Sequence, residues 1–295
     1  MKSRLAFILL AISMTGLLLM FAGCQKAEQK KEEAAAAPAA PVVNYNEMVF
    51  VPAGKCIIGG AADQAITKFS SPPHEVDLKS FWIDKYEVTF EQFLMFVAET
   101  GHPTQGNWRD FFSDDRAMDP VVNVTLEDAQ AYAEWQGKRI PTQEEWEKAA
   151  SWDPVNSTKR VYPWGDKWEE GRANTAEAGF RKPVPIGQMA GDVSFYGAHD
   201  MLGNVYEWSN SIYNRYPGSK LNDPNFRLKL YTLKGASCYL SGQNWNLAAR
   251  TAFPKNVLKG QGFRCAKDAT PEDEAQYTDQ VIKEGKAVTK AFEKK

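Results

Sequence analysis

Three segments of the chain combine an apolar face with a polar start, as short helices do. Each begins after a threonine, at Thr89, Thr125 or Thr142, and the third residue beyond it has an amide or carboxyl side chain. Such a side chain can bond back to the threonine's own amide while the threonine hydroxyl caps the helix. Gly101 and Gly137 are suited to end the first two helices, because glycine readily takes a left-handed conformation. The spacing therefore predicts three short helices whose first turns are closed by Gln92, Asp128 and Glu145.

The pattern changes beyond Ser151, where Trp, Gly, Pro and Asn break up short apolar runs. Runs of this length between turn residues are typical of short strands joined by long ordered loops. No internal repeat is present. The sequence therefore predicts an α+β fold with few short helices, short antiparallel strands and much irregular backbone. That backbone needs hydrogen-bond partners or bound ions to stay ordered.

The last residues, 269–295, form a separate segment with the signature of one further helix. Thr270 is placed as a cap, Pro271 suits the first helical position, and Asp273 follows three residues after the cap. An apolar stripe, interrupted by Gly285, consists of Tyr277, Val281, Val288 and Phe292. A helix docked on the domain and a partner-binding helix both fit this stripe, and we favour the docked helix.

The amino terminus has a basic start, an apolar run from Leu5 to Phe21 and then small residues, as a secretory signal peptide does. Residues 21–24, Phe-Ala-Gly-Cys, resemble a bacterial lipobox, which implies cleavage after residue 23 and a lipid on Cys24. The alternative is an ordinary signal peptide that contains a cysteine. Gln25 after the lipidated position implies, by the same resemblance, retention in the outer membrane. We therefore predict a lipoprotein of the bacterial cell envelope with a membrane anchor at Cys24.

Composition narrows the classes of partner. Residues 24–44 are charged and then Ala/Pro-rich, with a single lipidatable cysteine at the start, which predicts a tether. The formal net charge is −2, and Lys and Arg are not clustered. Binding to nucleic acid depends on such clusters, so we expect no nucleic-acid partner. A protein or peptide of the envelope is the expected partner class.

Several phrases together resemble one family, the formylglycine-generating enzymes or sulfatase-modifying factors. They occur in the family's order and read NEMVFVPAGKCIIGG, IDKYEVTFEQFLMFV, GKRIPTQEEWEKAA, YPWGD, DMLGNVYEWSNS and GQGFRCAKD. The resemblance covers about Asn46 to Asp268 and implies an α+β fold related to the C-type lectin fold. We accordingly expect a signal peptide at 1–23, a tether at 24–44, a sulfatase-modifying-factor-like domain at 45–268 and a helical tail at 269–295.

Active members of this family oxidise a protein cysteine to an aldehyde with oxygen and copper(I). Copper(I) prefers two thiolates, and the resemblance implies two cysteines in the segment from Ser237 to Arg250. Only Cys238 is present there. We therefore expect a binding or structural protein without oxidase activity, the alternative being an oxidase that uses Cys238 and Cys265 as an unusual copper pair. In an oxidising compartment the same two thiols are candidates for a disulfide, while Cys56 is read as a small core residue.

The resemblance also implies a structural calcium ion. Its ligands in this chain are the side chains of Asp200 and Glu207 and the carbonyls of Gly203 and Val205. Alternatively, Asp200 caps a turn and Glu207 pairs with an arginine, Arg250 or Arg264. A second family calcium loop falls at Asn174 and Thr175, but Ala178 stands where its acidic ligand belongs. We expect one calcium ion and not two.

The remaining candidates are weaker. The three histidines, His74, His102 and His199, do not form the His-x-x-x-His-x-Glu pattern of an iron-binding relative, so we expect no histidine-held metal. Tyr239 and Trp245 are candidates for a groove that takes peptide or sugar, although most such aromatic residues are core anchors. The glutamates at 144, 145 and 147 are read as charges favoured at a helix start.

Overall fold

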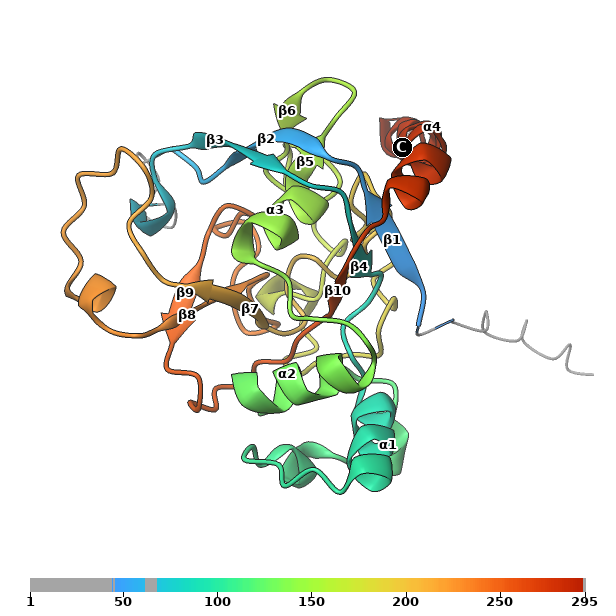
Figure 1. The fold of residues 1–295 in the computed structure, drawn as a ribbon, viewed down its shortest axis with the longest axis vertical. Coiled ribbons are helices and arrows are strands. Elements are labelled where there is room, and N and C mark those ends of the chain that lie inside the picture. Colours follow the sequence, from blue (N-terminus) through green and yellow to red (C-terminus); the bar gives the residue numbers. More distant parts are fainter. Residues whose placement is uncertain (1–43, 45, 62–67, 294–295) are drawn as a thin grey trace, which may run out of the picture. The chain divides into compact units, whose positions relative to one another are not determined.

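The computed structural model describes residue 44, residues 46–61 and residues 68–293, with side chains up to residue 290 (Figure 1). The predicted signal peptide, Cys24 and the predicted tether up to residue 43 lie outside this part. None of the helices described is long and apolar enough to cross a membrane. The helices are α1 (Phe90–Thr100), α2 (Leu126–Trp135), α3 (Gln143–Ser151) and α4 (Pro271–Glu293).

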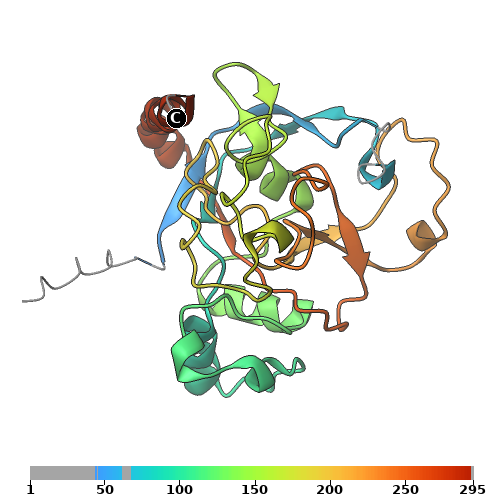
Figure 2. The ribbon, with the colours of Figure 1, turned by 180° about the vertical axis from the view of Figure 1, so that it is seen from behind.

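The strands of the described residues are short and pair with one another in antiparallel fashion, which confirms the predicted mixed fold. The strands are β1 (Met48–Val51), β2 (Gly54–Ile58), β3 (His74–Leu78), β4 (Phe81–Asp84), β5 (Trp152–Asp153), β6 (Thr158–Lys159), β7 (Glu207–Ile212), β8 (Tyr231–Lys234), β9 (Thr251–Phe253) and β10 (Ala266–Asp268). Their order in the sheets is β1-β4-β10, β2-β3, β5-β6 and β7-β8-β9. The chain between β6 and β7, drawn in yellow tones in Figure 2, is mostly irregular backbone.

The three predicted helix starts are confirmed. In α1, α2 and α3 the threonine hydroxyl accepts from the third helical amide, and that residue's side chain accepts from the threonine amide. Gly101 ends α1 in the left-handed conformation, with φ of 67°. Local chemistry therefore fixes these helix ends, and their apolar faces then enter the core through Phe93, Tyr132 and Trp146.

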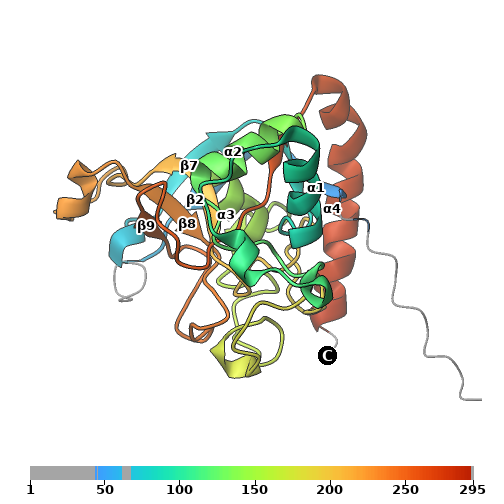
Figure 3. The ribbon, with the colours of Figure 1, turned by 90° about the horizontal axis from the view of Figure 1, so that it is seen from below.

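The tail helix α4 lies along one side of the domain (Figure 3). Thr270 and Asp273 form the predicted reciprocal bonds at its start. Val281 is buried, and Tyr277 packs against the rings of Phe50 and Trp82. At Gly285 a Cβ would come within 2.2 Å of the Phe195 ring, so glycine permits the close approach. These contacts support the docked helix over the free, partner-binding one; the side chain of Phe292 lies outside the described part.

Candidate functional site

The segment from Ser237 to Arg250 connects β8 to β9 and contains one cysteine. Cys238 is fully buried, and its backbone amide donates to the carbonyl of Asn204 at 3.1 Å. Burial raises the pKa of the Cys238 thiol to about 11. A thiol with that pKa stays protonated at neutral pH and is therefore a poor nucleophile.

The other two described cysteines are also buried and free. Burial, together with Asp84, raises the pKa of Cys265 well above its ordinary value, and its amide donates to Asp84 Oδ2 at 2.9 Å. Burial raises the pKa of Cys56 to about 11. The predicted disulfide between Cys238 and Cys265 is thus absent from the structure. Cys265 packs into the core beneath α1 and α2, whereas Cys238 lies in the loop against Asn204.

The far end of this segment is held by a buried lysine. The ammonium of Lys234 donates to Glu147 Oε2 at 2.6 Å and to the carbonyls of Leu247 and Ala249 at 2.9 and 3.1 Å. Glu147 also accepts from Lys159 and, at 2.6 Å, from the amide of Gly59. Glu147 is therefore buried at the centre of these contacts, whereas its place in the sequence indicated a charge favoured at a helix start. The sequence feature that could have indicated this role is Lys234, a charged residue at the end of the strand β8.

A second carboxylate also fastens the segment. Glu177 accepts from Thr175 Oγ1 and Ser241 Oγ, both at 2.6 Å, and from the amide of Gly242 at 3.0 Å. Burial acts to raise its pKa, but the hydrogen bonds from Ser241, Thr175 and Gly242 outweigh it and hold the pKa at about 2. The loop after Cys238 is thus tied to the second family calcium loop by a side chain that no sequence motif singled out.

The predicted calcium ligand Glu207 is instead paired with an arginine. Arg264 is fully buried and donates from Nε and Nη2 to the two oxygens of Glu207, at 2.7 Å each. The indole of Trp146 donates to the same carboxylate at 2.8 Å. Of the two arginines considered, Arg264 is the partner; Arg250 donates to the carbonyl of Phe69, at 3.0 Å from Nε.

Asp200, the other predicted calcium side chain, stands at a turn. It has a left-handed φ of 55°, and its Oδ2 accepts from the amide of Gly187 at 2.6 Å. Burial raises the pKa of Asp200 to about 6. Burial and the charge of Asp200 also raise the pKa of Glu87 and Asp192 well above their ordinary values. Burial and mutual repulsion thus hold the pKa values of these acids above their ordinary values.

The residues present do not fit the predicted calcium ion. A divalent cation on Glu207 would have to lie against the guanidinium of Arg264, which already binds both oxygens of that carboxylate. In the described part of the chain, no group of three or more His, Cys, Asp or Glu side chains is placed to hold a metal ion. The carbonyls of Gly203 and Val205 alone do not make a calcium site.

The three histidines have separate surroundings. His74 packs on the ring of Tyr216, and His199 packs on the ring of Tyr86. The Nε2 atom of His102 lies 3.0 Å from Asp128 Oδ1. Burial lowers the pKa of His199 to about 4. They do not share a site.

The two aromatic residues proposed for a groove are less buried than the tryptophans of the core. Tyr239 is 60% exposed, and the half-buried Trp245 packs edge-on against Tyr206 with ring centroids 5.9 Å apart. Trp146 and Trp208, in contrast, are fully enclosed. Tyr239 is therefore accessible on the surface, whereas Trp146 and Trp208 serve the core.

Comparison with known proteins assigns the chain to one family. Residues 33–269 match the sulfatase-modifying factor enzyme 1-like domain, and the chain belongs to this family. Among the relatives, hercynine oxygenase of Mycolicibacterium smegmatis is 31% identical over 68% of this chain and 54% of its own length. The chain thus spans about half the length of that relative.

Two further relatives come from Mus musculus. Inactive C-alpha-formylglycine-generating enzyme 2 is 28% identical over 75% of this chain and 86% of its own length. Formylglycine-generating enzyme is 27% identical over 76% of each chain. Among solved structures, PvdO from Pseudomonas aeruginosa has a TM-score of 0.59 and 25% identity over 75% of this chain and 94% of its own. The predicted family and fold are confirmed, while the predicted domain boundaries stay predictions.

Proposed function

We propose that this chain is a lipid-anchored protein of the bacterial cell envelope whose sulfatase-modifying-factor domain binds or supports other molecules and lacks oxidase activity. The carrying observation is the single, buried, protonated thiol of Cys238 in the segment where the family resemblance calls for two cysteines. Copper(I) needs thiolates, and one such thiol cannot supply the pair.

The alternative copper pair, Cys238 with Cys265, gains no support from the geometry. Both side chains are fully buried, and burial raises the pKa of each thiol. Forming two thiolates would require deprotonating both in surroundings that favour the neutral form. In the described part of the chain, the residues present therefore do not fit a copper(I) ion.

Two observations favour a binding role. The family includes a relative whose name records an inactive enzyme, so the domain is retained in a protein that is not an active oxidase. Tyr239, a large aromatic residue on the segment that follows Cys238, is 60% exposed. Aromatic residues with a polar end are enriched where proteins meet their partners. The expected partner is a protein or peptide of the envelope, and Cys24 supplies the lipid attachment.

One experiment tests the loss of oxidase activity. The full chain is incubated with copper(I), oxygen and a Cys-x-Pro-x-Arg peptide, with the formylglycine-generating enzyme of Mus musculus as the positive control. We expect no aldehyde by mass spectrometry and no stoichiometric copper on the protein. Aldehyde that disappears in the Cys238→Ser variant would establish the oxidase and reject the proposal. Membrane fractionation of Cys24→Ser, which we expect to be released, tests the anchor separately.

A further inference from the structure

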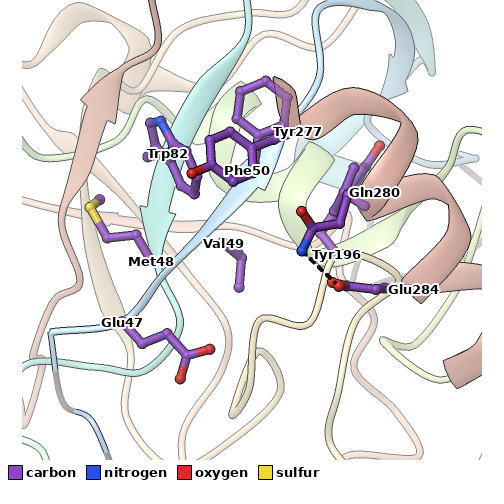
Figure 4. A pocket seen from close by; sticks show the side chains of 10 residues that line it. Glu47, Met48, Val49, Phe50, Trp82, Tyr196, Tyr277, Gln280 and Glu284 are labelled. Carbon is purple, nitrogen blue, oxygen red and sulfur yellow. Dashed lines mark hydrogen bonds between the residues drawn. The ribbon is translucent and has the colours of Figure 1, made fainter. Parts of the chain in front are cut away.

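A small cavity lies where the tail helix α4 meets the edge strand β1, away from the loop that contains Cys238. Its volume is about 200 Å³. β1 contributes Val49 and Phe50 to the wall, β4 contributes Trp82, and α4 contributes Tyr277 and Val281 (Figure 4). An apolar cavity of about 150 Å³ holds a benzene-sized molecule, so this one has room for a ring with a short chain.

The mouth of this cavity is acidic. Figure 4 shows the carboxylates of Glu47, beside β1, and Glu284, on α4, pointing from opposite sides toward the space beside Val49. Lys85 pairs with Glu47 at 3.1 Å, whereas Glu284 accepts only from the amide of Gln280, at 2.9 Å, in the part of the chain that the structure describes. One negative charge at the mouth is therefore not balanced by an ion pair.

The cavity has no positive side chain in its lining. Aromatic and aliphatic side chains form part of its walls, and two carboxylates, one amide and two tyrosines supply polar atoms. A ligand with an apolar body and one positive charge matches both features, because the body covers the rings and the charge meets the carboxylates. A bare metal ion would leave the apolar walls without a partner.

We propose that the cavity between β1 and α4 binds a small organic ammonium ion, its apolar body against Val49, Phe50 and Tyr277 and its ammonium group between Glu47 and Glu284. The helix α4 begins at Pro271, beyond residue 269, where the family match ends. One wall of the cavity and one of its two carboxylates thus lie outside the family domain. The site is independent of whether the domain oxidises cysteine.

The test uses the full chain and three matched probes that differ mainly in charge: 2-phenylethylamine, 2-phenylethanol and phenylacetate. Isothermal titration calorimetry should rank the ammonium first, the alcohol weaker and the carboxylate weakest. Raising the salt concentration should reduce the preference for the amine, because partly exposed charges are screened. Equal binding of the alcohol and the amine, or displacement of the amine by calcium chloride as effectively as by a second amine, would overturn the proposal.

Variants locate the site. Glu284→Gln should weaken binding of the amine about two- to fivefold and leave binding of the alcohol unchanged, as expected for a partly exposed charge pair. Asp279→Asn removes an exposed charge from the same helix without touching the cavity and should change neither. Val49→Phe, which fills the cavity, should abolish binding of both probes, with folding checked by circular dichroism. Equal effects of Glu284→Gln and Asp279→Asn, or unchanged binding in Val49→Phe, would reject the site.

Discussion

Two buried groups of charges hold this domain together, and they are built in opposite ways. In the first, the Glu147 cluster, one carboxylate faces the ammonium groups of Lys159 and Lys234. In the second, the Arg264 cluster, one guanidinium faces four carboxyl groups, those of Glu87, Asp192, Asp200 and Glu207. Positive charge is in excess in the first cluster and acid in the second.

The difference shows in the protonation of the acids. Burial acts to raise the pKa of Glu147, but Lys159 and Lys234 outweigh burial and leave the pKa below its ordinary value. In the Arg264 cluster burial prevails, and the pKa values of Glu87, Asp192 and Asp200 all rise. The lysines therefore favour the ionised form of Glu147, whereas burial disfavours the ionised forms of Glu87, Asp192 and Asp200.

The largest effect should come from removing the one acid of the first cluster. Glu147→Gln leaves Lys234 fully buried without its counter-charge, and we expect a loss of about 3–5 kcal/mol in the free energy of unfolding. Urea denaturation followed by circular dichroism measures it. Glu144→Gln, on the same helix and outside the ion pairs described, should change stability by less than about 0.5 kcal/mol. Similar values for the two variants would mean that the ion pairs of Glu147 do not stabilise the fold.

A smaller effect, with a distinct pH signature, should follow from neutralising one acid of the second cluster. The pKa of Asp200 is raised to about 6 in the folded chain, against 3.8 ordinarily. Its stabilising contribution is therefore fully present below pH 4 and is lost as the pH rises through 6. Asp200→Asn should remove this pH dependence and stabilise the domain at pH 7 by on the order of 2 kcal/mol. Asparagine also tolerates the left-handed φ at this position.

The measurement is a series of urea unfolding curves from pH 4 to pH 8. Asp279→Asn, an exposed change on α4, serves as the control and should follow the unchanged chain at each pH. If Asp200→Asn and the unchanged chain lose stability in parallel between pH 4 and 6, the protons of the Arg264 cluster do not reside on Asp200.

The two clusters also show which contacts can be predicted from the sequence alone and which cannot. The starts of α1, α2 and α3 were predicted because each depends on residues only three positions apart. Glu147 and Lys234 are 87 positions apart, and nothing local brings them together. The sequence offers the pairing of Glu207 with Arg264, 57 positions away, only as an alternative to calcium binding. Pairings that depend on tertiary packing leave no signal in local spacing, and the family resemblance implied calcium, not Arg264, as the partner of Glu207.

The smallest expected effect concerns calcium, and it bears directly on the acid excess of the Arg264 cluster. A ligand specific to the folded chain at a hundred times its Kd would stabilise it by about 2.7 kcal/mol and raise the Tm. Because Arg264 holds both oxygens of Glu207, we expect calcium chloride or a chelator to leave the Tm within error of that in magnesium chloride at equal ionic strength. A rise with calcium alone would mean that Glu207 exchanges the guanidinium for the ion. The second cluster would then balance its acids with a metal, as the first does with lysines, and the contrast between the two would disappear.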